Sequence, residues 1–370
     1  MAWTKYQVIL ALVMVATGSI NTLTTKWADH LESVGSNGKS HNFNHPFVQS
    51  FSMFLGEMLC LLAFKVIYFF YIRRQEGSLE DNQIVRGNQD FNPLIFLPPA
   101  MCDMIATSLM YIGLTLTYAS SFQMLRGSVI IFVAFLSMAF LERKIAIKQW
   151  VGIVHVILGL LIVGYSDFLI KGGHSSEAND INGVITGDLL IVMAQVITAL
   201  QMVYEEKYVT TRDIPPLQAV GWEGVFGATF LGLLLVPFSF ITVPYPFANN
   251  SNMTLEDVID ALVQMSNNFF IIVSLAGTIF SIAFFNFAGV SVTKEMSATT
   301  RMILDSVRTL FIWLFSLYFA WQQFHPLQIV GFAFLIAGMC VYNNLIPSFS
   351  DLRQRFAPQE PLINQAADQP

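Results

Sequence analysis

Seven ionisable side chains stand inside long apolar stretches of this chain, where charge is costly. Three are arginines and four are carboxylic acids: Arg126, Arg301, Arg308, Glu57, Asp103, Glu223 and Asp305. The chemistry that such groups can perform is the binding of charged ligands. A guanidinium binds an anion, and a carboxylate binds a cation or a proton. Each costs about 2.5–3.5 kcal/mol at the centre of a membrane, so an unpaired set would exceed the net stability of a typical protein. We therefore expect these groups to pair or to face a wet cavity.

Arg126 is the most isolated of these charges, since it is the only charged residue between Ala119 and Leu141. Gln123 precedes it by three residues and shares its helical face. We expect Arg126 to face a central cavity, close to acidic residues from the other half of the chain. The candidate substrate-binding residues are Arg126, Gln123, Glu57, Asp103, Asn286 and Asp305.

A structural explanation stands beside the functional one for several of these residues. Arg301 lies near the end of its apolar stretch, where a long side chain could reach the membrane surface. Asp305 and Arg308 could form a clamp within one helix. Glu223 lies early in its stretch and could also reach the interface, and Asn286 could simply join helices. Four further charged residues lie near the ends of their stretches and are left out of the set because they can reach water: Lys65, Asp167, Asp188 and Glu205.

No motif for covalent chemistry occurs in the sequence. It has no phosphate-binding glycine loop, no nucleophile elbow and no His/Cys cluster. Cys60, Cys102 and Cys340 lie within apolar stretches, without metal or redox spacing. His41 and His45 are four residues apart, but two ligands do not make a metal site. We therefore expect no enzyme activity, no cofactor and no metal, and any transport has to be secondary or facilitative.

Composition indicates which elements must position these residues. Of 370 residues, 54% are hydrophobic and 12% are charged, against about 25% charged in a soluble domain. A membrane-crossing helix needs about 20 apolar residues. Ten stretches of about this length occur, at residues 6–25, 47–71, 94–115, 119–141, 147–168, 185–205, 218–241, 269–290, 297–321 and 327–346. The chain is thus predicted to be an all-α integral membrane protein with ten transmembrane helices, and its modest charge of −6 does not suggest nucleic-acid binding.

An internal repeat divides the chain into two halves. Residues 119–159 align without a gap with residues 298–338, at an offset of 179, and Arg126 then aligns with Asp305. The fourth and fifth apolar stretches therefore correspond to the ninth and tenth, which predicts two repeats of five helices. An odd number of helices in each repeat inverts the second in the membrane, as in carriers with alternating access. A duplication in a purely structural protein would leave the same pattern.

The distribution of basic residues predicts the orientation. If the N-terminus is cytosolic, loops on that side hold twelve Lys and Arg residues and loops on the other side hold three. Such an excess is typical of the cytosolic side. Asn249 and Asn252 each begin an N-glycosylation sequence in a loop that the count places on the opposite side. We therefore expect glycosylation there if the protein enters the secretory pathway.

Several motifs resemble a known family. The stretch SSFQMLRGSVIIFVAFLSMAFLERKIAIKQWVGI resembles the fourth and fifth helices of the drug/metabolite transporter superfamily, with a small polar pair, an early basic residue, a charged ERK exit and QWxG. The strings TGSINTL, FLPPAMCDM, ITGDLLI and SIAFFNFAGVSVTKEMSATTRMILDSVRT look like subfamily F of solute carrier family 35. The resemblance extends from Met1 to about residue 346.

This resemblance implies two inverted five-helix repeats of the EamA type, with both termini in the cytosol. With the internal repeat, it places the first repeat at residues 1–168, a lumenal linker at 169–184, the second repeat at 185–346 and a disordered cytosolic tail at 347–370. It also implies residence in endolysosomal membranes, with a mitochondrial association as the alternative. Much of family 35 carries nucleotide sugars, but family membership alone does not define a substrate.

Two functional hypotheses follow. The first is a secondary transporter of a small polar metabolite, working by alternating access between the repeats. The second is a membrane interaction or regulatory protein that descends from a carrier; such a protein would have no reason to retain seven charges within its spans. The expected partners are a small solute of unknown identity and the lipid bilayer. A homodimer is also considered, and a mitochondrial carrier partner is implied by the resemblance alone.

Overall fold

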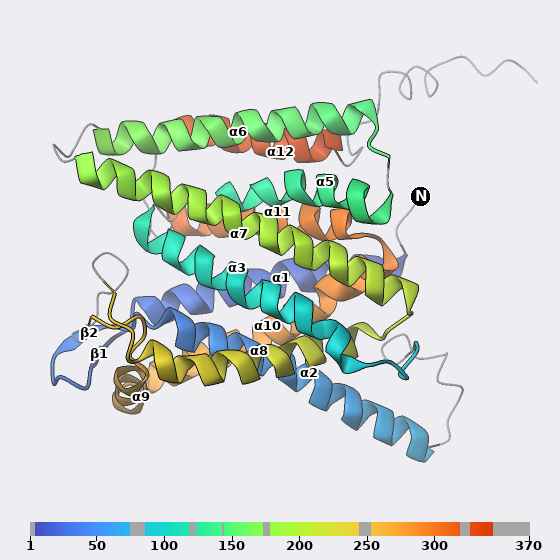
Figure 1. Ribbon diagram of the computed structural model, residues 1–370, viewed down its shortest axis with the longest axis horizontal. Coiled ribbons are helices and arrows are strands. Elements are labelled where there is room, and N and C mark those ends of the chain that lie inside the picture. The colour runs from blue at the N-terminus through green and yellow to red at the C-terminus, as the bar shows by residue number, and fades with distance from the viewer. Residues whose placement is uncertain are drawn as a thin grey trace, which may run out of the picture.

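The computed structural model describes residues 4–74, 86–117, 122, 124–142, 144–172, 178–243, 253–318 and 326–342, and over these residues the chain is a bundle of long helices (Figure 1). The long helices of the first half are α1 (Lys5–Asp29), α2 (Pro46–Arg74), α3 (Leu97–Leu116), α5 (Val129–Leu141) and α6 (Ile147–Gly172). Those of the second half are α7 (Ala178–Thr211), α8 (Pro216–Phe238), α10 (Phe269–Glu295), α11 (Ala298–Tyr318) and α12 (Pro326–Tyr342). The short elements are β1 (Glu32–Val34), β2 (Ser40–Asn42), η2 (Pro93–Phe96), η3 (Arg126–Ser128) and α9 (Val258–Asn267).

Seven helical stretches among the described residues are long and apolar enough to cross a membrane: α1, α2, η2 with α3, α6, α7, α8 and α10. The stretch formed by η3 and α5, and the helix α12, are apolar but shorter. Large apolar side chains point away from the bundle, and Leu161 and Leu233 are 65% and 67% exposed. Water would disfavour such a surface, whereas lipid accepts it. These features confirm the predicted class, an all-α membrane protein.

Close helix pairs in the bundle run antiparallel, and glycines allow their approach. On α8, Gly221 lies against Leu61 of α2, and Gly227 lies against Phe54. Residue numbers therefore rise along one helix as they fall along the other. A Cβ at either glycine would collide with α2, so the absence of a side chain sets the distance between these helices.

α6 and α12 cross at two reciprocal glycine contacts. A Cβ on Gly152 would lie 2.7 Å from the carbonyl oxygen of Gly338, and one on Gly159 would lie 2.7 Å from that of Gly331. These contacts also run in opposite directions along the two helices. α6 and α12 lie side by side in Figure 1, while α1 packs against α10 and α3 packs against α7.

Several helices extend beyond the apolar stretches that predicted them. α1 continues to Asp29, and α7 starts at Ala178 and ends at Thr211. The linker predicted at 169–184 falls partly within α6 and α7, with residues 173–177 outside the described part. Once a helix is nucleated, each further residue adds a hydrogen bond at little cost. A helix can therefore continue into polar sequence that hydropathy does not detect.

The fourth apolar stretch differs from its prediction as a single helix over 119–141. The 3₁₀ turn η3 (Arg126–Ser128) precedes α5, and residues 118–121 and 123 lie outside the described part. Gly127 sits in this turn and is a weak helix former, and short 3₁₀ segments commonly replace an α-helix at such points. Arg126 thus occupies a turn and not the interior of an α-helix.

The end of the bundle away from the N-terminus carries a small cap that the sequence did not predict (Figure 1). β1 and β2 form an antiparallel hairpin between α1 and α2, and α9 lies between α8 and α10. Gln264 of α9 donates from Nε2 to the backbone carbonyls of Ser33, at 3.3 Å, and His41, at 3.1 Å. These bonds join a loop of the first half to a loop of the second.

Candidate functional site

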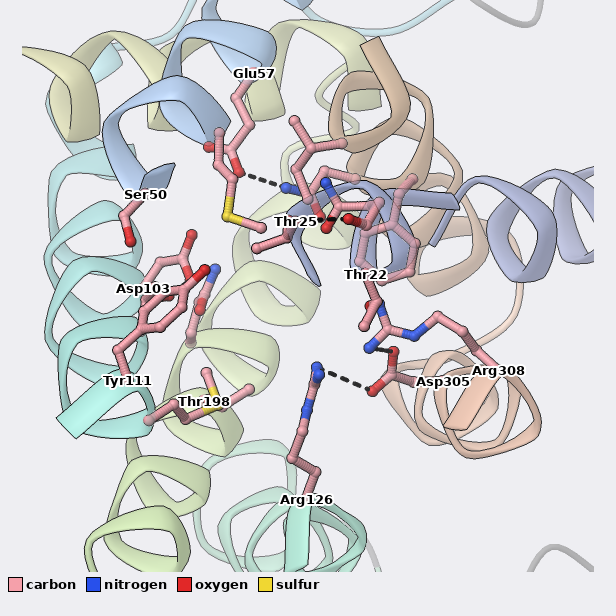
Figure 2. A pocket seen from close by; sticks show the side chains of 18 of the residues that line it. Thr22, Thr25, Ser50, Glu57, Asp103, Tyr111, Arg126, Thr198, Asp305 and Arg308 are labelled. Carbon is pink, nitrogen blue, oxygen red and sulfur yellow. Dashed lines mark hydrogen bonds and ion pairs between the residues drawn. The ribbon is translucent and has the colours of Figure 1, made fainter. Parts of the chain in front are cut away.

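A cavity of about 390 Å³ lies within the bundle. It is lined by residues of α1, α2, α3, η3, α5, α7, α8, α10 and α11, so both halves contribute to it. Along α1 the lining extends from Met14 to Asp29 and continues to His30, which follows the helix and lies next to the hairpin, and on α2 it extends from Ser50 to Glu57. Cavities of about 300–1,000 Å³ are typical of small-molecule sites. Figure 2 shows charged and polar side chains pointing into this space.

Arg126 and Arg308 both approach Asp305 at one side of the cavity (Figure 2). Arg126 Nη2 lies 3.8 Å from Asp305 Oδ2, and Arg308 Nη2 lies 2.8 Å from Oδ1. The Arg308 side chain is 3% exposed and its guanidinium lies 4.7 Å from the ring centre of Phe285, whereas the Arg126 side chain is 22% exposed. Asp305 and Arg308 are therefore more than a clamp within one helix, because Arg126 shares the same carboxylate.

A second group in the cavity contains the predicted residues Glu57, Asp103 and Asn286. Asn286 Nδ2 donates a hydrogen bond to Glu57 Oε1, and Thr107 Oγ1 donates to Asp103 Oδ1 at 3.3 Å. Glu57 is buried, and its Oε2 has no hydrogen-bond partner among the described residues. Asn286 thus both lines the cavity and joins α10 to α2.

Glu205 and Arg301 form a buried ion pair, which corrects two expectations. Glu205 was left out because it lies at the end of an apolar stretch, but α7 continues past it to Thr211 and its side chain is 1% exposed. Arg301 was open to an interpretation as a residue that reaches the membrane surface, but it is buried and lines the cavity. The end of the apolar stretch is the end of the hydrophobic part of α7, but the buried interior of the protein extends as far as Glu205.

Glu223 is likewise buried in the cavity lining, so it does not reach the interface. Glu57, Asp103 and Glu223 interact electrostatically with Arg301, and Glu205 pairs with it directly. Full ionisation of these four carboxyls and Arg301 would give a formal charge of −3. The group of Arg126, Arg308 and Asp305 has a formal charge of +1. Buried charge of one sign requires compensation. The acidic group is therefore suited to a cation or to protons, and the basic group to an anion.

Contacts at the N-terminal end of the bundle join α10 to α1 and to the turn between α7 and α8. Lys294, at the end of α10, places Nζ 2.7 Å from Asp213 Oδ1 and 3.1 Å from the carbonyl oxygen of Ile214. Gln7 of α1 donates from Nε2 to the carbonyl of Glu295 at 3.5 Å. None of these residues belongs to the cavity lining, which instead reaches His30 beside the hairpin.

Lys26 and Asp29 also line the cavity, and the sequence analysis did not select them. They lie beyond the first apolar stretch, in the last turn of α1. Gln49 Nε2 donates to Asp29 Oδ1 at 2.7 Å, which fixes this carboxyl. Thr25 and Lys26 each lie three or four residues from Thr22 on one side and from Asp29 on the other. This spacing places them on one helical face and could have revealed a polar stripe.

Three predicted positions lie outside the described residues, and the structure adds nothing about them: Gln123, Asn249 and Asn252. The tail at residues 347–370 also lies outside. Of the six candidate substrate-binding residues, five line the same cavity: Arg126, Glu57, Asp103, Asn286 and Asp305.

Comparison with known proteins identifies related chains. The family described as nucleotide-sugar transporter matches residues 4–220. Human solute carrier family 35 member F6 is 54% identical over 93% of this chain and 91% of its own length. Its mouse counterpart is 52% identical over 97% and 95%, and an uncharacterized protein of Schizosaccharomyces pombe is 32% identical over 91% and 98%.

A solved crystal structure superposes with a TM-score of 0.55, covering 93% of this chain and 98% of its own, at 11% identity. At that identity the likeness shows the fold alone. The family match covers more than half of the chain, and the sequence relatives cover nearly all of it. The chain therefore belongs to the nucleotide-sugar transporter family and to solute carrier family 35.

Proposed function

We propose that the chain is a secondary transporter that moves a small polar solute by alternating access between two inverted five-helix repeats, at residues 1–168 and 185–346. The observation that carries this proposal is the charged cavity of about 390 Å³, to which both halves contribute. Membership of a transporter family supports it independently.

Reciprocal helix contacts support the inverted repeat. At the offset of 179, Gly152 corresponds to Gly331 and Gly159 to Gly338. Exchanging the halves therefore converts the Gly152–Gly338 contact into the Gly331–Gly159 contact, and both are present. The α1–α10 and α3–α7 pairs exchange in the same way. Antiparallel packing of α2 on α8 and of α6 on α12 is what two-fold symmetry in the membrane plane would produce.

We assign the solute to the space between the two charged groups. Arg126 would bind an anionic group of the solute, because its ion pair with Asp305 is long and its side chain is partly exposed. Glu57 and Asp103 would bind a cationic group, with Asn286 and Gln123 as hydrogen-bonding partners. A zwitterion satisfies both ends. A nucleotide sugar, with two phosphate charges, fits less well because full ionisation of the two groups would give them a combined formal charge of −2.

The orientation proposed here places the N-terminus in the cytosol and the hairpin on the lumenal side. The cavity lining reaches His30 beside the hairpin, whereas the ion pair of Lys294 with Asp213 at the other end lies outside the lining. A lumenal hairpin agrees with the excess of basic residues at the other end. An endolysosomal membrane is the location we propose, because the resemblance to subfamily F of solute carrier family 35 implies it.

Reconstitution in liposomes tests the proposal. Purified protein is assayed for uptake of zwitterionic, cationic and anionic metabolites, with Arg126→Gln and Asp103→Asn beside the wild type. We expect saturable uptake of a zwitterionic solute that both variants reduce. Folded protein that transports no member of a broad panel would favour the alternative, a membrane interaction protein derived from a carrier.

A further inference from the structure

His41, His45 and Asp260 bring three potential metal ligands together at the hairpin end of the bundle, away from the cavity. One ring nitrogen of each histidine and a carboxylate oxygen of Asp260 all lie within 4.8 Å of one another. His41 Nε2 is 2.8 Å from Asp260 Oδ2, and His45 Nε2 is 3.3 Å from the same oxygen. We propose that these three residues form a zinc-binding site.

The hydrogen bonds around the two histidines place their lone pairs toward the shared point. His45 Nδ1 lies 2.7 Å from Glu256 Oε1, and His41 Nδ1 lies 3.2 Å from the backbone carbonyl oxygen of Lys39. Both partners accept hydrogen bonds, so each Nδ1 carries the donated proton. In the neutral imidazole Nε2 then bears a lone pair. Metal-binding histidines are oriented in this way, by donation from the second ring nitrogen to a carboxylate or a carbonyl.

The facing atoms require positive charge between them. Asp260 Oδ2 is an acceptor, and two further acceptors, the histidine Nε2 atoms, face it. Its other oxygen, Oδ1, already accepts from the backbone N–H of Ser36 at 2.6 Å and from its hydroxyl at 2.9 Å. Two arrangements meet this requirement. Each histidine can bind a second proton at Nε2, or one divalent ion can bind both Nε2 atoms and the carboxylate oxygen. Zinc bonds of about 2.0–2.2 Å in a tetrahedron place the ligand atoms about 3.3–3.6 Å apart. The separation of 3.3 Å from His45 Nε2 to Asp260 Oδ2 matches this value, and the separation of 2.8 Å from His41 Nε2 would have to lengthen.

Burial and position favour a built site over a chance cluster. The side chains of His45 and Asp260 are both 3% exposed, whereas that of His41 is 37% exposed. The opening at His41 gives an ion a way in and leaves room for water as a fourth ligand, which is common at three-ligand zinc sites. Asp260 follows His41 by 219 residues. Because the third ligand is so distant in the sequence, His41 and His45 alone did not predict a metal site. The ion would join the α1–α2 loop of the first half to α9 of the second.

Direct metal analysis tests the site on the full-length protein, purified in detergent without a polyhistidine tag and stripped with a chelator. Zinc is added, unbound zinc is removed by gel filtration, and bound zinc is measured by mass spectrometry beside the thermal unfolding midpoint. We expect one zinc per chain and a higher midpoint. His41→Ala should weaken zinc binding at least about 10–100-fold, since loss of an outer-shell partner alone has that effect. Lys39→Ala is the matched control on the same hairpin, because only its backbone carbonyl takes part.

Two results would overturn the proposal. Wild-type protein that retains no stoichiometric zinc would show that the histidines hold protons, and equal binding by His41→Ala would place the ion elsewhere. Cobalt substitution of the wild type gives a second measurement that does not depend on a variant folding. We expect visible absorption bands of tetrahedral cobalt that added zinc removes, and bound cobalt without such bands would contradict the site.

Discussion

Arg126 and Arg308 share one carboxylate, yet replacing each should have different consequences. The Arg308 side chain is 3% exposed and lies 2.8 Å from Asp305, whereas that of Arg126 is 22% exposed and lies 3.8 Å away. Arg126→Gln leaves Asp305 paired with Arg308, so we expect folding to be little affected. Arg308→Gln leaves only the longer, partly hydrated contact for that carboxylate, so we expect a larger loss of stability.

The magnitudes separate a binding residue from a structural one. A partly exposed ion pair contributes about 0–1 kcal/mol to the free energy of unfolding, and breaking a buried pair costs about 3–5 kcal/mol. A charge-assisted hydrogen bond to the solute contributes about 1.5–3 kcal/mol, or about 10- to 150-fold in affinity. Arg126→Gln should therefore lower solute affinity by that factor while costing no more than about 1 kcal/mol of stability.

Two assays on the same preparations distinguish a solute-binding role of Arg126 from a structural one. Unfolding in detergent gives the stability of each variant, and uptake at solute concentrations below KM gives the effect on affinity. The reasoning is refuted if Arg126→Gln takes up every transported solute as fast as the wild type. It is also refuted if the two arginine variants lose stability equally.

Other consequences concern the ion pair, the helix crossing and the orientation. Arg301→Gln should destabilise the protein by about 3–5 kcal/mol, and combining it with Glu205→Gln should cost less than the sum in a double-mutant cycle of unfolding; additivity would contradict the pair. Gly224→Ala should cost about 1–3 kcal/mol, because its Cβ would meet the backbone of α2, and unchanged stability would argue against that crossing. An endoglycosidase-sensitive mobility shift should disappear when Asn249→Gln and Asn252→Gln are combined, whereas protease cleavage of this loop from the cytosolic side of sealed vesicles would reverse the orientation.

Much of the site could be predicted from the sequence because charged residues are rare in the apolar stretches of a membrane protein. Arg126 stood out as a single charge in an apolar stretch, and the repeat aligned it with Asp305, which it meets in the structure. Glu57 and Asp103 stood out for the same reason, and both line the cavity. Each inference rests on the cost of an unpaired ion in an apolar environment, which does not depend on details of packing.

The remaining parts depend on where helices end and on contacts between distant segments. Glu205 is the last residue of its apolar stretch and Asp29 lies beyond the first one, so hydropathy placed both within reach of water, although α7 and α1 include them. The hairpin has strands of three residues, too short for an alternating pattern to be seen. Asp260 meets His41 only because the cap folds two loops together, and one sequence contains no signal for such a meeting.

Access to the cavity from both sides of the membrane is the most direct test of the proposed transport mechanism. Thr25 lines the cavity, and Thr25→Cys can be placed in a background in which Cys60, Cys102 and Cys340 are replaced. A membrane-impermeant thiol reagent is then applied to either side of sealed proteoliposomes. We expect modification from both sides, with a transported solute changing the two rates in opposite directions as it shifts the populations of the two states. Modification from one side alone, whatever solute is present, would contradict alternating access.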